Sequence, residues 1–212
     1  MTEAVLFDLD GTLIDSVQDL ALAVNHALSG LGLPERPVAE IAGFVGEGAR
    51  RLVERAVGAR AELVEPALNL WWEHYRRHLL DHTSLYPGIA ELLEAARVPL
   101  AVHTNKPGAL ARRILDGLGV LDQFVAVVGG DEAPRKPDPA GSRLLLARMG
   151  VAGEDALYVG DSVIDVELAR AVPMPVASVT WGLVPEERLL AAGATMLIRQ
   201  VNELLPLVGA AR

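Results

Sequence analysis

Four aspartates in this sequence are spaced so that they could act together. Asp8 and Asp10 end a short apolar run, and an extended backbone points residues two apart toward the same side. Asp161 and Asp165 follow Gly160 four residues apart, so a helix that starts there would carry both on one face. Carboxylates crowded together repel one another and need a cation. Hard oxygen ligands with open positions suit Mg²⁺, which also takes substrate phosphate.

Two further residues could bind a phosphoryl group beside that cation. Lys136 offers a positive charge and Thr104 a hydroxyl donor. The sequence holds only two lysines, Lys106 and Lys136, among its 19 basic residues. Because a compact ammonium fits close to a phosphate or carboxylate where a planar guanidinium does not, this scarcity suggests that lysine stands where arginine would not serve. Chance is the alternative, and Lys106 could equally well approach the site or only precede a helix.

These residues would meet if the chain folds as a parallel sheet. Short apolar runs predict strands over 4–9, 99–104, 124–128, 156–159, 176–180 and 195–198. Helical patterns lie between them, from Pro107 to Gly117 or Gly119 and over 140–149, 163–171, 185–192 and 200–208. Strands that alternate with helices predict an α/β fold with a Rossmann-like parallel sheet and right-handed crossovers.

The polar residues follow the ends of four predicted strands. In an open parallel sheet, ligands bind beyond the carboxyl ends of the strands. The residues at those ends are Asp8 and Asp10, then Thr104 and Asn105, then Lys136, and finally Asp161 and Asp165. Segments far apart in the sequence are therefore expected to form one site at one edge of the sheet.

The segment 15–83 breaks the alternation of strands and helices. It has no convincing strand, and its apolar residues recur at helical spacing, as in Leu20, Val24 and Leu28. Tyr86-Pro87-Gly88 then marks the return to the α/β pattern. We expect an α/β core of residues 1–14 and 84–212, with a helical domain of residues 15–83 inserted after the first strand.

The overall composition limits the partners. With 28 acidic and 19 basic residues, the net charge of −9 repels nucleic acid and anionic membranes. No stretch reaches the ~18 consecutive apolar residues of a membrane span. The sequence has no cysteine, which excludes disulfides and thiolate chemistry. We expect a soluble cytoplasmic protein whose partner is a small phosphorylated metabolite, with no nucleic acid and no membrane. The sequence leaves the oligomeric state open.

Four motifs, in order along the chain, resemble those of the haloacid dehalogenase superfamily. Asp8-Leu9-Asp10-Gly11-Thr12 resembles the first motif, Thr104-Asn105 the second, Lys136-Pro137 the third, and Gly160-Asp161-Ser162-Val163-Ile164-Asp165 the fourth. The helical insert lies where that superfamily places its smaller type of cap. The resemblance implies a Mg²⁺-dependent phosphatase, that is, a phosphoric monoester hydrolase.

The resemblance also implies a role for each matched residue. Asp8 would attack phosphorus as a nucleophile and form an aspartyl phosphate. A carboxylate is ionised at pH 7, so Asp8 would need no base. Asp10 would protonate the leaving oxygen and then activate water. The phosphoryl oxygens would be held by Gly11, Thr104, Asn105 and Lys136. Mg²⁺ would be bound by Asp8, the carbonyl of Asp10, and Asp161, with Asp165 as an outer ligand or an orienting residue.

Within the superfamily, the sequence is most similar to phosphoglycolate phosphatases. The similar segments are Thr104-Asn105-Lys106-Pro107, Gly129-Gly130-Asp131, Arg135-Lys136-Pro137-Asp138-Pro139, Val179-Thr180-Trp181-Gly182 and Ala192-Gly193-Ala194. Val172-Pro173 departs from the usual Ala-Gly, and Thr195 stands where an acidic residue is common. The resemblance implies 2-phosphoglycolate as substrate.

The carboxylate of 2-phosphoglycolate asks for a cation or a cluster of donors. The segment Gly46-Glu47-Gly48-Ala49-Arg50-Arg51 offers backbone amides and two guanidiniums. We expect Arg50, with Gly48, to recognise the substrate, and the alternative is a plain turn into a helix.

Other functions remain open. A related phosphatase could act on nucleotides, sugar phosphates or pyrophosphate, a phosphomutase would share the motifs, and a non-catalytic scaffold is a rival from another class. A dehalogenase is disfavoured, because a reaction without an oxygen leaving group needs no acid such as Asp10. His74, His78 and His82 are expected on one helical face, where they could bind a metal, although a solvated face is favoured.

Overall fold

The computed structural model describes residues 2–209, which form two compact units. One unit is Asp15–Ser84, and the other combines the residues up to Ile14 with those from Leu85 onward. The chain passes between the units through two short strands, β2 (Ile14–Asp15) and β3 (Ser84–Leu85), which pair with each other. The strand residue Asp15 therefore falls within a segment that was expected to hold no strand.

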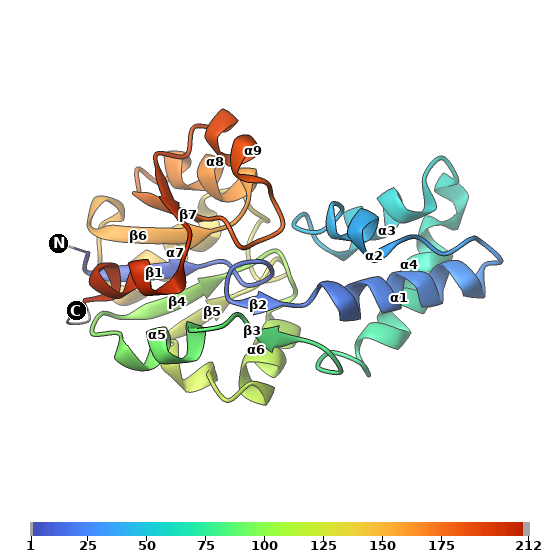
Figure 1. Ribbon diagram of the computed structural model, residues 1–212, viewed down its shortest axis with the longest axis horizontal. Coiled ribbons are helices and arrows are strands. Elements are labelled where there is room, and N and C mark those ends of the chain that lie inside the picture. The colour runs from blue at the N-terminus through green and yellow to red at the C-terminus, as the bar shows by residue number, and fades with distance from the viewer. Residues whose placement is uncertain (1, 210–212) are drawn as a thin grey trace. The chain divides into compact units, whose positions relative to one another are not determined.

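The larger unit contains a sheet of six parallel strands, ordered β5-β4-β1-β6-β7-β8 (Figure 1). The strands are β1 (Ala4–Phe7), β4 (Leu100–His103), β5 (Ala126–Val128), β6 (Ala156–Gly160), β7 (Val176–Val179) and β8 (Met196–Ile198). Every predicted strand forms, and the α/β fold with a parallel sheet is confirmed. Three of them, β1, β4 and β7, end one or two residues before the predicted apolar runs do, because the last residues of those runs enter the loops at the carboxyl edge.

The strands read as apolar runs because helices cover both faces of the sheet. All four residues of β1 and all five of β6 are buried. On one face, α7 (Ala140–Met149) and α8 (Val163–Ala171) pack Leu145 and Leu168 against Leu6 and Tyr158. Phe7 points to the other face, where its ring meets that of Phe124 edge to face, with centroids 6.5 Å apart.

The remaining helices of this unit are α5 (Ile89–Ala95), α6 (Gly108–Gly117) and α9 (Glu186–Ala191). Helix α6 begins directly after Pro107, and α9 directly after Pro185, as expected from their patterns. Helix α5 was not predicted. The predicted helix over 200–208 is instead a 3-10 helix, η4 (Val201–Val208), with Pro206 inside it. Proline has no N–H and cannot make the bond that an α-helix requires there. Shorter 3-10 turns lie at η2 (Leu121–Gln123) and η3 (Gly153–Asp155).

The smaller unit is helical. Its elements are α1 (Val17–Gly30), α2 (Val38–Ala42), α3 (Ala49–Val57), η1 (Ala61–Leu63) and α4 (Val64–Tyr75). Helices α1 and α4 pack together, and the ring of Trp71 stacks on that of Tyr75 with centroids 4.6 Å apart. No helix within residues 2–209 is long and apolar enough to cross a bilayer.

Helix α4 ends at Tyr75, so the prediction that three histidines share a helical face is wrong. His78 and His82 lie beyond the helix. The rings that do stack are those of His26 on His74 and of His74 on His78, with centroid distances of 4.5 and 4.3 Å. The backbone N–H of His82 instead donates to Asp19.

Asp19 anchors the segment that leaves the helical unit. This buried side chain of α1 accepts hydrogen bonds from the backbone N–H groups of His82 (3.1 Å) and Thr83 (2.8 Å). The hydroxyl of Thr83 also donates to it, at 2.7 Å. One carboxylate therefore ties the start of α1 to the residues directly before β3.

We expect Asp19→Ala to destabilise the helical unit by about 2–4 kcal/mol, because three donors, of which the two of Thr83 are buried, lose their acceptor. Urea unfolding followed by tryptophan fluorescence measures this, since Trp71 and Trp72 both lie in α4. Asp15→Ala is the matched control: the exposed Asp15 accepts one hydrogen bond, from the N–H of Val17, and its loss should cost less than about 1 kcal/mol. Equal losses in the two variants would contradict the role given to Asp19.

Candidate active site

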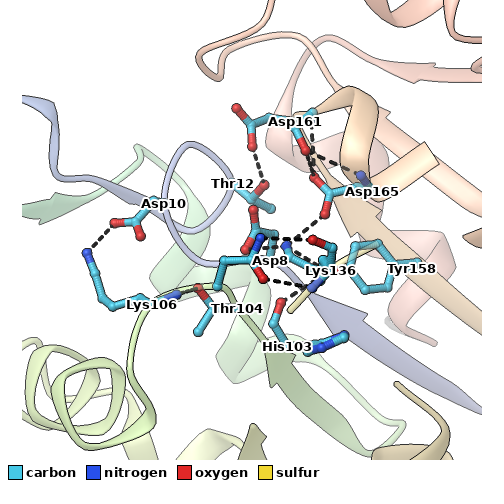
Figure 2. A network of polar contacts seen from close by, with 12 residues as sticks. Asp8, Asp10, Thr12, His103, Thr104, Lys106, Lys136, Tyr158, Asp161 and Asp165 are labelled. Carbon is cyan, nitrogen blue, oxygen red and sulfur yellow. Dashed lines mark hydrogen bonds and ion pairs between the residues drawn. The ribbon is translucent and has the colours of Figure 1, made fainter. Parts of the chain in front are cut away.

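Loops from the carboxyl ends of the strands bring the predicted residues together. Asp8 follows β1, Thr104 follows β4, and Asp161 follows β6, while Lys136 lies in the loop after β5. Figure 2 shows these side chains converging on Asp8. The parallel sheet therefore produces the convergence expected from the sequence, because all these strands point the same way.

Lys136 is the centre of the buried contacts. Its ammonium lies 2.7 Å from the Oδ1 atom of Asp8 and 2.8 Å from the Oδ1 atom of Asp165, and it donates to the hydroxyl of Tyr158 at 3.1 Å. All three N–H donors of the ammonium thus have an acceptor. Burial alone would lower the pKa of Lys136, but the negative charges of Asp165 and Asp8 raise it well above its usual value.

Tyr158 is a site residue that the sequence did not reveal. It stands in the apolar strand β6 and is fully buried, and its hydroxyl donates to the backbone carbonyl of His103 at 3.1 Å. Its sequence context is that of a core residue. His103 itself is a packed strand residue, with its Nδ1 atom 2.9 Å from the hydroxyl of Ser142.

Asp165 lies in the first turn of helix α8 and forms a capping box with Ser162. The helix starts at Val163, the hydroxyl of Ser162 accepts from the N–H of Asp165, and the Oδ2 atom of Asp165 accepts from the N–H (3.1 Å) and hydroxyl (2.6 Å) of Ser162. Asp161 therefore precedes the helix, and the prediction that it shares a helical face with Asp165 is wrong. With both its oxygens engaged by protein donors, Asp165 is suited to orient its neighbours.

Asp161 is held by residues from two segments, the loop after β1 and the loop after β7. Its Oδ1 atom accepts from the hydroxyl of Thr12 at 3.3 Å, and its Oδ2 atom from the backbone N–H of Leu183 at 2.7 Å. Gly11, which has a φ of +86°, and Gly182 leave no room for a side chain, because a Cβ at either position would overlap Asp161. Both glycines are therefore required for this carboxylate to approach the loop after β1.

Three carboxylates could hold a cation. Asp8, Asp161 and Asp165 are buried and each offers an oxygen within 4.8 Å of the others, the only such group within residues 2–209. Burial raises the pKa of Asp161 to about 8, with the charges of Asp8 and Asp165 adding to the effect. Burial likewise raises the pKa of Asp8 to about 7, although Lys136 opposes this.

These pKa values correct the expectation that Asp8 is ionised at pH 7 by itself. Burial raises the pKa of Asp8 into the neutral range, so without a cation the protonated form of Asp8 would be populated near pH 7. A divalent cation beside Asp8 and Asp161 would favour their ionised forms. The donor set of hard carboxylate oxygens therefore fits a divalent metal ion.

Besides the ion pair of Lys136 with Asp8, the site contains an ion pair of Lys106 with Asp10. The ammonium of Lys106 is 2.7 Å from the Oδ1 atom of Asp10, and Figure 2 shows this pair on the opposite side of Asp8 from Asp165. Of the two alternatives left open for Lys106, the structure supports an approach to the site. The backbone N–H of Lys106 also donates to the hydroxyl of Thr104 at 3.1 Å.

Asn105 holds the loop that carries Lys136. Its Oδ1 atom accepts from the backbone N–H of Lys136 at 2.8 Å, and its Nδ2 atom donates to the carbonyl of the same residue at 3.3 Å. The structure thus engages the side chain of Asn105 with the backbone of Lys136, whereas a phosphate contact was expected of this residue.

The two residues expected to recognise the substrate lie in the helical unit. Gly48, with a φ of +88°, directly precedes α3, and Arg50 stands in its first turn. The guanidinium of Arg50 pairs with Glu65 at 2.5 Å and lies 3.9 Å from Glu54, and its side chain is 45% exposed. Its present partners are therefore glutamates of its own unit.

Comparisons with known proteins agree with this geometry. The family of haloacid dehalogenase-like hydrolases matches residues 2–172. A phosphoglycolate phosphatase of Rhodospirillum rubrum is 44% identical over 195 residues, which cover 86% of this chain and 81% of the relative. One of Chromobacterium violaceum is 38% identical over 216 residues, covering 97% and 96%.

A solved structure shares the whole fold. The crystal structure of a predicted phosphoglycolate phosphatase from Haemophilus somnus superposes with a TM-score of 0.91 at 29% identity, and the match covers 97% of both chains. The motifs, the arrangement of their residues and these matches lead to one assignment: the chain belongs to the haloacid dehalogenase-like hydrolase family.

Proposed function

We propose that this protein is a Mg²⁺-dependent phosphatase that hydrolyses 2-phosphoglycolate through an aspartyl phosphate on Asp8. The observation that carries the proposal is the buried contact of Lys136 with Asp8, next to Asp161 and Asp165. The names of the relatives support the substrate, since those from Rhodospirillum rubrum and Chromobacterium violaceum are both phosphoglycolate phosphatases.

In the first step, Asp8 acts as the nucleophile. An oxygen of its carboxylate attacks phosphorus as the bond from phosphorus to the ester oxygen breaks. Mg²⁺, bound by Asp8, Asp161 and the carbonyl of Asp10, would neutralise negative charge on the phosphoryl group and keep Asp8 ionised. Lys136 and the hydroxyl of Thr104 contribute donors to the phosphoryl oxygens, together with backbone amides near Gly11 and Asn105.

In both steps, Asp10 transfers the proton. It first gives a proton to the leaving ester oxygen, so that this oxygen departs as the neutral hydroxyl group of glycolate. It then takes a proton from water as the water oxygen attacks phosphorus, which breaks the bond between phosphorus and Asp8 and restores the free carboxylate. Asp165 takes no part in bond changes, because it orients Lys136 and the start of α8.

The helical segment 15–83 would act as a cap over this chemistry. The short paired strands at Asp15 and Leu85 are the positions where the backbone would bend. Closure of the cap would exclude bulk water while Asp8 attacks. Arg50 and Gly48 would then contribute to recognition of the substrate.

We expect phosphate release to be abolished by EDTA and restored by Mg²⁺, because two buried carboxylates need a cation to ionise together. Calcium should inhibit, since its larger and more flexible coordination shell misplaces the nucleophile. A colorimetric screen of phosphometabolites measures both points. A preference of less than about tenfold for 2-phosphoglycolate over nucleoside monophosphates and sugar phosphates would refute the assignment of 2-phosphoglycolate as the substrate. Full activity in the presence of chelator would refute the proposed requirement for Mg²⁺.

We expect Asp8→Asn to remove turnover, because an amide is a poor nucleophile. Asp10→Asn should still form the phosphoenzyme from p-nitrophenyl phosphate, whose leaving group departs without a proton, and should then stall. Mass spectrometry of the quenched Asp10→Asn variant would show one added phosphoryl group on Asp8. An Asp8→Asn variant that keeps about a tenth of the wild-type rate would exclude Asp8 as the nucleophile.

We expect the metal-free protein to lose stability as the pH rises from about 6.5 to about 8.5. The pKa values of Asp8 and Asp161 rise from 3.8 to about 7 and about 8 on folding, so the folded chain binds more protons and loses this advantage as it ionises. His103, whose pKa falls from 6.5 to about 3 on burial, acts oppositely, but most of its effect on stability lies below pH 6.5.

Melting temperatures in EDTA at the two pH values measure this loss, and Mg²⁺ should remove most of it. Asp161→Asn is the control, since an amide has no proton to lose and the variant should show a weaker fall. A melting temperature in EDTA that stays constant or rises over this range would contradict the pKa values given to Asp8 and Asp161.

A further inference from the structure

Lys106 is a buried cation whose position its own loop fixes. Its side chain is only 6% exposed and pairs with Asp10 at 2.7 Å. Its backbone N–H donates to the hydroxyl of Thr104, and its carbonyl accepts from the N–H of Gly130 at 3.0 Å. The ammonium is therefore held at a defined place, two residues from a proposed phosphoryl ligand.

The two lysines of the chain serve different sides of the site. Lys136 contacts the nucleophile Asp8, and Lys106 contacts Asp10, the proposed acid (Figure 2). Because the acid must meet the leaving oxygen, a group that touches Asp10 lies beside the leaving group and away from the attacking carboxylate. Lys106 is thus placed to contact the leaving group of the phosphate ester.

The proposed substrate has a negative charge at that place. In 2-phosphoglycolate, a single methylene group separates the ester oxygen from the carboxylate carbon, so a neighbour of the leaving oxygen also reaches the carboxylate. An ammonium has three donors, so Lys106 can keep its bond to Asp10 and add one to the substrate. Hydrogen bonds between an ammonium and a carboxylate are charge-assisted, and burial strengthens them.

We propose that Lys106 binds the carboxylate of the substrate and so selects esters with an anionic leaving group. The inference rests on the function proposed above and assigns the selection to the α/β core. Arg50 is the competing cation, but its side chain is 45% exposed and already paired with Glu65. Lys106 is the more desolvated of the two, and a desolvated cation discriminates more strongly between a charged and a neutral group.

A matched pair of esters tests the proposal. 2-Hydroxyethyl phosphate has the same chain length as 2-phosphoglycolate but a neutral hydroxymethyl group in place of the carboxylate. For Lys106→Met, the ratio of kcat/KM for phosphoglycolate to that for hydroxyethyl phosphate should fall by about 10- to 100-fold. This ratio does not depend on how much of the variant is folded, because both esters are measured on the same preparation.

Binding without turnover gives a second measurement. In the Asp8→Asn background, calorimetric titration with 2-phosphoglycolate should show a Kd raised by at least about tenfold when Lys106→Met is added. The Kd of 2-hydroxyethyl phosphate should change by less than about threefold. Lys106→Gln, which keeps a donor but no charge, should lie between the wild type and Lys106→Met in both measurements.

The competing roles predict different results. If Lys106 serves only to position Asp10, Lys106→Met will lower kcat/KM equally on both esters, and the inference is overturned. It is also overturned if the ratio changes in Arg50→Ala and not in Lys106→Met. A wild-type enzyme with no preference for phosphoglycolate refutes the proposed substrate, whereas a preference that survives Lys106→Met refutes only the inference.

Discussion

The contact of the Lys136 ammonium with two buried carboxylates is the constraint on which the rest of the site depends. Charges at such depth are costly unless each is paired and hydrogen-bonded. The fold meets this demand from separate segments: β6 supplies Tyr158, the loop after β4 supplies Asn105, and the start of α8 supplies Asp165. Tyr158 and Asp165 contact the ammonium itself, and Asn105 fixes the backbone of Lys136, so the placement of this lysine against Asp8 depends on several segments of the sheet.

The same arrangement leaves a surplus of negative charge. Three carboxylates lie near one ammonium. Burial raises the pKa values of Asp8 and Asp161, and the charges of the neighbouring carboxylates add to the effect. The three carboxylates carry three negative charges against the single positive charge of Lys136, so a divalent cation bound beside them would restore neutrality. The metal-free core is therefore held in a less favourable charge state, which a bound cation would relieve.

Local patterns predicted the sheet and the acidic residues well, because parallel strands are apolar throughout and their polar ends stand out in the sequence. They did not predict contacts made through tertiary packing. The sequence context of Tyr158 is that of a core residue, and only the structure shows that its hydroxyl contacts Lys136. The spacing of Asp161 suggested a helical position, but Ser162 is the N-cap and Asp161 precedes the helix. The ionisation of Asp8 could not be predicted either, since it depends on burial and on like charges from a distant segment.

The rarity of lysine has one more consequence, for the chemistry of labelling. The only side-chain amines of this chain are those of Lys106 and Lys136, and both are buried and held by carboxylates. Reagents that acylate amines need an accessible nitrogen, which neither residue offers in the folded core. Acylation of these two lysines therefore proceeds only when the core opens, and its rate measures local unfolding around Asp8 and Asp10.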